Sequence, residues 1–410
     1  MVDRIRDTIK NFKMLKRGDT VCVAVSGGVD STVLLDVLAS LKEELCLELV
    51  VCHLNHNLRG RESERDFRFV KELSARLGLK FEGKKIPLGE VRKRGKKGGG
   101  ESLQEWARTR RLAFLEEAAG KHGARRIAVG HNRDDQAETV LMRFIKGSGL
   151  RGLTGMREVR DSFIRPLIDT PREEIERYAK ERKIKFVTDS SNRREKYLRN
   201  RLRLELIPLL EEGYNPKIRE ALARTAFILK RDEQYLSARA DRASSRVART
   251  GRGGVIMDRK KLLSLDKALS SRVFIKATTE AGGGSTDTAL SAEHVEAFFG
   301  LIKGERPNAC ISLPGRLHLR REYEKVILAS GPPPKPKPFG KRLAVPGTTE
   351  IREAGCLIET TLLKRPPRPY TGSRTTAYFD YDALAGKGGR PLRVRSWKEG
   401  DRMRPLGMKG

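Results

Sequence analysis

The stretch Ser26–Ser31, SGGVDS, decides the fold of the first half of this chain. It follows the apolar, β-branched segment Thr20–Val25 (TVCVAV) and leads into Ser31–Leu41, whose apolar residues recur at helical spacing. We therefore predict a buried strand, a tight turn and a helix, in that order. Gly27 and Gly28 let the backbone approach an anion without a Cβ in the way, and the helix N-terminus supplies free N–H groups. The stretch thus predicts a phosphate-binding turn.

Strand and helix signals alternate after this turn. Strands are predicted at 47–54, 80–86 and 126–129, and helices at 67–77, 101–119 and 134–144. This alternation is typical of an α/β fold with a doubly wound, mostly parallel sheet. In such folds, ligands bind at the carboxyl ends of the strands, where the SGGVDS turn lies.

The length of 410 residues predicts more than one domain. The segment 331–339 (GPPPKPKPF) has the composition of a semi-rigid linker. We expect a catalytic domain at 1–213 and a helical middle domain at 214–330, which includes a hairpin at 310–330. A small β-rich domain is expected at 340–410.

The formal net charge is +32, from 85 Lys and Arg against 53 Asp and Glu. Such an excess predicts a polyanionic partner, with nucleic acid as the first candidate and an anionic membrane surface as the second. No run of 18 apolar residues is present, and the start of the chain, MVDRIRDTIKNF, has no apolar signal core. We therefore expect no membrane partner.

The five cysteines are scattered, and none forms a Cys-x-x-Cys pair. They are Cys22, Cys46, Cys52, Cys310 and Cys356. An odd number without paired spacing predicts reduced thiols in a cytoplasmic protein and no cysteine-built zinc site.

The residue types of SGGVDS favour a nucleotide over a simple capped turn. Ser26 and Ser31 offer hydroxyls, and the Asp30 carboxylate suits a Mg²⁺ ion held between it and phosphates. A strand-to-helix turn capped by Ser or Asp would need no ligand. The Walker spacing and G-x-G-x-x-G are both absent. The stretch resembles the PP-loop signature of the ATP pyrophosphatases, an adenine nucleotide alpha-hydrolase-like fold. This resemblance implies ATP bound by Ser26, Gly27, Gly28, Val29, Asp30 and Ser31, with Mg²⁺ on Asp30.

Several longer motifs follow in order. They are 53–60 (HLNHNLRG), 130–139 (GHNRDDQAET), 146–153 (KGSGLRGL), 165–167 (RPL), 189–192 (DSSN), 197–203 (YLRNRLR) and 400–407 (GDRMRPLG). Together they closely resemble the tRNA(Ile)-lysidine synthetase family. The resemblance implies that L-lysine is joined to C2 of the wobble cytidine of an isoleucine tRNA with a CAU anticodon. The C2 oxygen is first adenylated, with release of pyrophosphate, and the lysine ε-amine then displaces AMP.

Two carboxylates suit the lysine of this reaction. Asp135 and Glu138 are three residues apart, on one face of the first turn of a predicted helix. Such a pair can hold a substrate ammonium, and one member could accept its proton. We assign helix N-capping to the neighbouring Asp134 instead.

Histidines and an arginine are expected on the ATP side. His131 ends the strand before these carboxylates, and His53 is expected to line the nucleotide pocket. His56 could do the same or cap a turn. Arg108 and Arg111 lie three apart on one helix, and the family's matching position favours Arg111 as the catalytic cation that stabilises the phosphates.

Segment 193–203 (RREKYLRNRLR) is strongly basic. Helical spacing puts Arg199 and Arg203 on one face, and the family match assigns Arg203 to the active site. Tyr197 could stack on a base. Predicted tRNA contacts are Arg194, Tyr197, Arg199, Arg201, Arg395, Arg402 and Arg404. The basic, glycine-rich loop 91–100 is expected to be solvated and to add to RNA attraction.

Two other functions stay open at this point: another PP-loop tRNA-modifying enzyme such as a cytidine thiolase, and a non-catalytic basic RNA-binding protein. The lack of paired cysteines argues against the thiolase, and Ser26, Asp30 and Asp135 argue against the second. In the family, a lysine-rich strand usually follows the motif at 400–407, so the last domain is expected to be truncated at Gly410. A homodimer is compatible with the resemblance.

Overall fold

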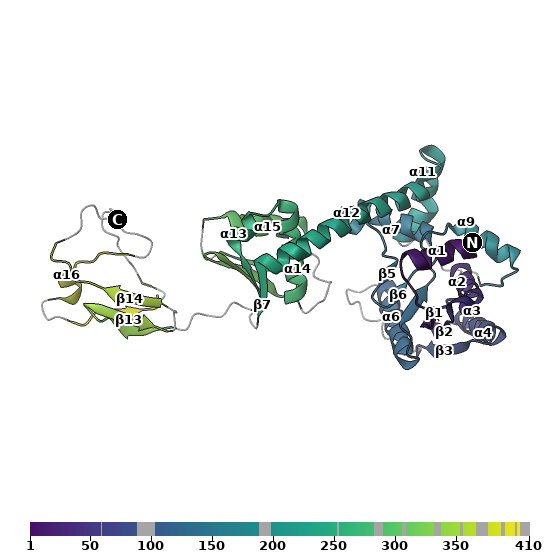
Figure 1. The fold of residues 1–410 in the computed structure, drawn as a ribbon, viewed down its shortest axis with the longest axis horizontal. Helices are drawn as coiled ribbons and strands as arrows, with labels where there is room; N and C mark the ends of the chain where they lie inside the picture. The colour runs from purple at the N-terminus through teal and green to yellow at the C-terminus, as the bar shows by residue number, and fades with distance from the viewer. Residues whose placement is uncertain are drawn as a thin grey trace. The chain divides into compact units, whose positions relative to one another are not determined.

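The computed structural model describes residues 1–58, 60–87, 103–187, 198–251, 254–282, 290–305, 309–331, 338–352, 356–365, 376–386, 390–397 and 400–401. The chain divides into two compact units, Met1–Asp241 and Arg242–Gly410 (Figure 1). The boundary falls within the long helix α12 (Ile218–Val247). The finer division into a catalytic, a middle and a C-terminal domain stays a prediction.

The first unit is built on a six-stranded sheet in the order β3-β2-β1-β4-β6-β5. Its strands are β1 (Thr20–Ala24), β2 (Glu48–Asn55), β3 (Lys80–Lys85), β4 (Arg126–Val129), β5 (Val159–Arg160) and β6 (Phe163–Ile164). All neighbours pair in parallel except β5 and β6. The predicted doubly wound, mostly parallel sheet is therefore confirmed.

Helices cover both faces of this sheet, as Figure 1 shows. The helices of this unit before α12 are α1 (Val2–Asn11), α2 (Val29–Ser40), α3 (Lys42–Leu45), α4 (Arg61–Arg76), α6 (Leu103–Lys121), α7 (Arg133–Ile145), α8 (Leu150–Leu153), α9 (Arg172–Glu181), α10 (Leu198–Arg201) and α11 (Ile207–Gly213). A π-helical turn, Leu202–Leu206, joins the last two.

The central strand β1 explains the two layers. Val21 and Val23 face a core formed with α1, α2 and α9, whereas Cys22 faces a second core formed with α6. Successive side chains of a strand point to opposite faces, so a wholly apolar strand must be covered twice. The carboxyl ends of β1, β2, β4 and β6 are left to carry polar loops.

The second unit contains an antiparallel sheet in the order β7-β8-β11-β10-β9. Its strands are β7 (Ala248–Gly251), β8 (Gly254–Asp258), β9 (Cys310–Leu313), β10 (Leu317–Glu322) and β11 (Lys325–Ser330). The helices α13 (Arg259–Leu263), α14 (Lys267–Ala281) and α15 (Ala292–Lys303) pack on it through one apolar cluster. The predicted helices and the hairpin are present; β7 and β8 were not predicted.

The short length of β7 and β8 explains why they were missed. Each has five residues or fewer, and β8 is stabilised by pairing with β11, which lies about 70 residues later. Gly254 has a φ of +113°, and a Cβ there would lie 2.1 Å from the Leu328 carbonyl oxygen. Only glycine permits this close pairing.

Short strands make up the described part of the C-terminal region, as predicted. β12 (Gly340–Arg342) pairs with β15 (Arg393–Arg395), and β13 (Gly347–Ile351) pairs with β14 (Cys356–Thr360). One helical turn, α16 (Tyr381–Ala385), follows β14 in the chain. Among the described helices of the whole chain, none is long and apolar enough to cross a bilayer.

Candidate active site

A cavity of about 1040 Å³ lies at the carboxyl ends of β1, β2, β4 and β6. Nine of the residues predicted for the active site line it: Ser26, Gly28, Val29, Asp30, Ser31, His53, Arg111, His131 and Arg203. They come from β2, from the connections that follow β1 and β4, from α6 and from the π-helical turn Leu202–Leu206, so only the folded chain brings them together. This is the position at which α/β folds bind ligands.

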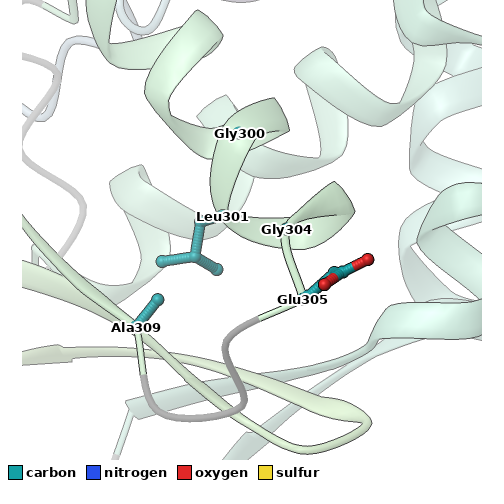
Figure 2. A pocket seen from close by; sticks show the side chains of 5 residues that line it. All are labelled: Gly300, Leu301, Gly304, Glu305 and Ala309. Carbon is teal, nitrogen blue, oxygen red and sulfur yellow. The ribbon is translucent and has the colours of Figure 1, made fainter.

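A second cavity, of about 430 Å³, lies in the other unit (Figure 2). Its lining consists of Gly300, Leu301, Gly304, Glu305 and Ala309. One carboxylate among glycine and aliphatic residues does not form a catalytic group, so we assign no chemistry to this cavity.

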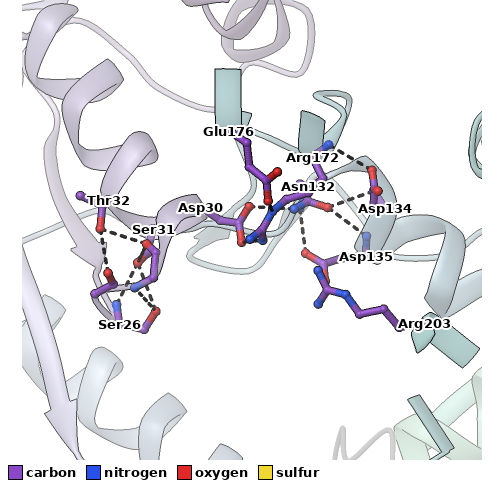
Figure 3. Close-up of polar contacts among 12 residues, drawn as sticks. Ser26, Asp30, Ser31, Thr32, Asn132, Asp134, Asp135, Arg172, Glu176 and Arg203 are labelled. Atoms are coloured by element: carbon purple, nitrogen blue, oxygen red, sulfur yellow. Dashed lines mark hydrogen bonds and ion pairs between the residues drawn. The ribbon is translucent and has the colours of Figure 1, made fainter. Parts of the chain in front are cut away.

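The SGGVDS turn forms an open anion cradle. Gly27 has a φ of +96°, and a Cβ there would lie 2.7 Å from Val187 Cγ2. The Ser31 hydroxyl donates to the Gly28 carbonyl at 3.0 Å and lies 3.1 Å from the Ser26 hydroxyl. The two serine hydroxyls thus form hydrogen bonds within the turn and stabilise it (Figure 3). No side chain caps the N-terminus of α2 at Gly28, so its N–H groups can receive a phosphate.

Asp30 stands beside this cradle with a partner on each carboxylate oxygen. Oδ1 accepts a hydrogen bond from Asn132 Nδ2 at 2.9 Å, and Oδ2 pairs with the Arg172 guanidinium (Figure 3). Burial raises the pKa of Asp30, while Arg172 and Asn132 act in the opposite direction. The carboxylate is thus held ready in one orientation by two partners.

The same carboxylate fits a Mg²⁺ ion. The described residues contain no group of three or more His, Cys, Asp or Glu side chains that could hold a metal ion alone. Mg²⁺, however, is commonly held by one or two carboxylates together with substrate phosphates. Asp30 lies next to the phosphate cradle and retains lone pairs that neither partner uses.

Asn132 organises the first turn of α7. It is 1% exposed, and its Oδ1 accepts from the Asp134 and Asp135 N–H groups at 2.9 and 3.0 Å. Asp135 Oδ2 accepts in return from the Asn132 N–H at 3.0 Å, which completes a capping box. The prediction that Asp134 caps this helix is therefore wrong. Asp134 Oδ1 instead accepts from the Arg172 N–H at 3.1 Å.

Asp135 and Glu138 lie on one face, as their spacing predicts, and Arg199 bridges them. Arg199 Nε donates to Glu138 Oε2 at 2.8 Å, and its Nη2 donates to Asp135 Oδ1 at 2.9 Å. Arg203 Nε lies 3.5 Å from Glu138 Oε1, so both arginines share the face that helical spacing assigned to them. Glu138 is 1% exposed, and burial raises its pKa. A guanidinium thus occupies the position predicted for a substrate ammonium.

The histidines of the cavity are neutral. Burial lowers the pKa of His131 to about 4, and burial together with Arg111 lowers the pKa of His56 to about 4. His53 Nδ1 donates to the Val25 carbonyl at 2.7 Å, and burial lowers its pKa as well. Burial and the nearby Arg108 lower the pKa of Arg111. The cavity therefore combines neutral imidazoles with guanidinium groups.

Comparison with known proteins identifies the family. A family model described as a PP-loop domain matches residues 1–210. The tRNA(Ile)-lysidine synthase of Geobacter sulfurreducens is 37% identical over 417 residues, which cover 100% of this chain and 86% of that protein. The chain belongs to the tRNA(Ile)-lysidine synthase family.

Two further comparisons give the range of similarity. The tRNA(Ile)-lysidine synthase of Solibacter usitatus is 36% identical over 402 residues, which cover 97% of this chain and 86% of that protein. Among solved structures, the U34-tRNA thiolase NcsA of Methanococcus maripaludis matches 56% of this chain and 78% of its own, at 20% identity and a TM-score of 0.44. We draw family membership in the lysidine synthases from the sequence relatives alone.

Three residues of this lysidine synthase family member were missed in the sequence. Asn132 could have been found, because Asn followed by an acidic residue three positions later is a capping-box pattern. Arg172 opens α9 directly after Pro171, and Arg165 lies after β6. Arg165 opens the RPL motif at 165–167 but was given no role, and no local signal marks Arg172, because its partners Asp30 and Asp134 lie 142 and 38 residues away in the chain.

Several predicted RNA contacts lie outside the described residues: Arg194, Tyr197, Arg402, Arg404 and the loop 91–100. Of the others, Arg201 lies 3.4 Å from Glu205, and Arg395 pairs with both carboxylate oxygens of Asp401 at 2.7 and 2.6 Å. In this lysidine synthase family member, these RNA contacts stay predictions.

Proposed function

We propose that this chain is a tRNA(Ile)-lysidine synthase that joins L-lysine to C2 of the wobble cytidine in a CAU-anticodon tRNA(Ile), using ATP. The observation that carries this proposal is one hydrogen-bonded unit. Asn132 holds Asp30 beside the phosphate cradle and caps the helix that bears Asp135 and Glu138. A nucleotide site and a site for an ammonium group are thereby held next to each other.

On the nucleotide side, the cradle Ser26–Ser31 would bind the phosphates of ATP, and Asp30 would hold Mg²⁺. A bound Mg²⁺ supplies positive charge that offsets the charge of the phosphates. Arg111 and Arg203 line the same cavity and would stabilise the departing pyrophosphate. His53, fixed by the Val25 carbonyl, would line the nucleotide pocket.

On the amino-acid side, Asp135 and Glu138 would hold the lysine ammonium in place of the Arg199 guanidinium. Glu138 would accept a proton from this ammonium, because burial raises the pKa of Glu138. Transfer of one proton to it leaves a neutral amine. The amine nitrogen then bonds to C2, the bond from C2 to the adenylated oxygen breaks, and AMP leaves with that oxygen. His131 is neutral and lines the cavity beside this helix.

The net charge of +32 supports tRNA as the polyanionic partner. We propose that Arg194, Tyr197, Arg201, Arg395, Arg402 and Arg404 contact it, together with Arg199 once lysine has replaced it. A cytoplasmic location and a homodimer are further proposals; light scattering of the purified chain tests the dimer.

A thiolase is the weaker candidate. Cys52 is the only cysteine that lines the large cavity described above. A hydrogen bond with Cys22, together with burial, raises the pKa of the Cys52 thiol, which disfavours the thiolate that sulfur transfer requires.

The direct test is release of AMP and pyrophosphate from ATP in the presence of CAU-anticodon tRNA(Ile), with and without lysine. We expect stoichiometric, lysine-dependent release and a tRNA that gains the mass of lysine less one water. Incorporation of sulfur, or AMP release that does not depend on lysine, would exclude the proposed function. Binding of tRNA without any pyrophosphate release would support the non-catalytic alternative.

A further inference from the structure

Arg165 is a buried arginine that has no acidic partner among the described residues. It follows β6, lines the large cavity and is 9% exposed. Its Nη1 donates to the Arg157 carbonyl at 2.7 Å, while its Nε is buried without a hydrogen-bond partner in the described part of the chain. A buried cation without a counter-ion is costly, so its retention calls for an anionic ligand.

The orientation of the side chain selects the kind of ligand. Because Nη1 is used by a carbonyl, the edge formed by Nε and Nη2 remains available. These two N–H groups are parallel, and together they match the two oxygens of a carboxylate in bidentate fashion. Burial and the nearby Arg108 and Arg160 lower the pKa of Arg165, while Glu158 acts in the opposite direction without forming an ion pair with it.

Hydrogen bonds tie Arg165 to the helix that carries the proposed ammonium site. The Gln136 side chain, one residue after Asp135, accepts from the Met156 N–H at 2.7 Å and donates to the Met156 carbonyl at 3.2 Å. The next residue along, Arg157, supplies the carbonyl that fixes Arg165. The guanidinium is thus attached, through one short segment, to the first turn of α7.

His131 lies near both the Arg165 guanidinium and the Asp135 carboxylate of α7. It follows β4, the strand that pairs with β6, and burial and the nearby Arg165 lower its pKa while the nearby Asp135 acts in the opposite direction. His131 Nδ1 is also buried without a hydrogen-bond partner among the described residues. The phosphate cradle follows β1, on the far side of β4 from Arg165. A ligand of Arg165 is therefore closer to the ammonium site than to the phosphate cradle.

We propose that Arg165 binds the α-carboxylate of the amino-acid substrate, while the carboxylates of α7 hold its ammonium group. This proposal rests on the proposed function, because it specifies how that site selects an amino acid over a simple amine. A free amino acid is a zwitterion, and its burial requires a fixed cation as well as a fixed anion. Arg165 would then be a specificity-determining residue.

The test compares L-lysine with L-lysinamide, which lacks the carboxylate charge but keeps both amines. We expect the Arg165→Met variant to lose about 10- to 100-fold in kcat/KM for lysine, the size of a charge-assisted bidentate contact, with little change for lysinamide. The KM for ATP should stay within about 2-fold, since the phosphates bind elsewhere. Arg182→Met is the control, because Arg182 is an exposed arginine of the same unit that lies 3.5 Å from Asp36 and does not line this cavity.

Three results would overturn the proposal. They are an equal loss for lysine and lysinamide in Arg165→Met, a raised KM for ATP instead of lysine, and equal use of the two amines by the unaltered protein. The last comparison needs no variant. If Arg165→Met does not fold, Arg165→Lys takes its place. This variant keeps the positive charge but not the two parallel N–H groups, so its loss in kcat/KM for lysine should be intermediate. If the unaltered protein releases AMP only in the presence of lysine, a negative result here concerns Arg165 alone. If it does not, both this proposal and the proposed function are wrong.

Discussion

Asn132 donates a hydrogen bond from Nδ2 to Asp30 Oδ1 at 2.9 Å, across 102 residues of chain. The same side chain accepts through Oδ1 from the Asp135 N–H at 3.0 Å. One buried amide therefore fixes the carboxylate beside the phosphate cradle and the helix that carries the paired carboxylates. Only an amide supplies both a donor and an acceptor here, because a carboxylate can only accept.

This double role predicts that Asn132→Ala and Asn132→Asp differ in their effects on stability and on turnover. Asn132→Ala removes the cap and the bond to Asp30, so we expect the free energy of unfolding to fall by about 1–3 kcal/mol, and turnover to fall with it. Asn132→Asp keeps a capping oxygen but faces Asp30 with a second negative charge. We expect it to retain most of the stability and to lose turnover. Urea unfolding and AMP release measure the two effects.

The control for this pair is Asp258→Ala, which removes the cap of α13 in the second unit, where Asp258 accepts from the Lys261 N–H at 3.1 Å. It should cost similar stability and leave AMP release intact. Equal turnover in Asn132→Asp and the unaltered chain would contradict the role given to the amide donor.

Replacement of Asp30 should stop the chemistry without preventing RNA binding. Asp30→Ala removes the carboxylate beside the cradle and frees Arg172, and we expect AMP release to fall below detection while tRNA affinity persists. Asp36→Asn is a matched control on the same helix, where the Tyr178 hydroxyl donates to Asp36 at 2.9 Å. Near-normal turnover of Asp30→Ala would rule out a role for this carboxylate in holding Mg²⁺.

Asp135→Asn tests the proposed ammonium site. The amide oxygen can still accept from the Asn132 N–H, so the capping box is retained while the charge is lost. We expect the KM for lysine to rise about 10- to 100-fold, the size of a charge-assisted hydrogen bond, and the KM for ATP to stay unchanged. Asp134→Asn removes a charge one residue away and should leave the KM for lysine unaltered. A normal KM for lysine in Asp135→Asn would show that the ammonium binds elsewhere.

Acidification should destabilise the protein through His131. Its pKa is about 4 in the folded state because it is buried, against an ordinary value of 6.5. Between about pH 4 and 6.5 the unfolded chain therefore binds a proton that the folded chain does not, so stability falls as the pH falls through this window. The contribution is at most about 1.4 kcal/mol per pH unit. Unfolding in urea at several pH values should show a shallower dependence in His131→Asn; identical slopes would refute the assignment.

The C-terminal region should contribute to the salt dependence of tRNA binding. We expect the joint replacement of Arg395, Arg402 and Arg404 by Ala to weaken binding. Each lost phosphate contact should reduce the slope of log K against log salt by about 0.7–0.9. Arg352→Ala is a control, because Arg352 is an exposed arginine that lies 3.1 Å from Glu350 and has no predicted RNA contact. An unchanged slope in the triple variant would remove these arginines from the tRNA interface.

Local patterns predicted four of the six strands in the sheet of the first unit, β1 to β4, but not the two-residue strands β5 and β6. The apolar, β-branched segment before SGGVDS and the helical spacing after it predict β1 and α2, which the structure contains at Thr20–Ala24 and Val29–Ser40. The spacing of Asp135 and Glu138 likewise predicted their common face. These features were predictable because each depends on residues within one or two turns or strands of one another.

The partners of the site residues were not predictable in this way. Arg172 reaches Asp30 across 142 residues, and Arg199 reaches Glu138 across 61. Both contacts depend on the order of strands in the sheet and on where α9 and α10 pack, which no local periodicity encodes. The same is true of Arg165, whose burial without a counter-ion exists only in the folded molecule.

The amino-acid sequence alone therefore established the α/β class, the turn between β1 and α2 and the family, since each is written in short segments with a set order. Tertiary structure alone decided which charges meet. It joined the cradle to the carboxylate helix through Asn132, set Arg199 on the carboxylates and left Arg165 Nε without a hydrogen-bond partner among the described residues. The physical reason is that electrostatic interactions and burial depend on distances in space, and in this fold the groups concerned come from connections that follow different strands of the sheet.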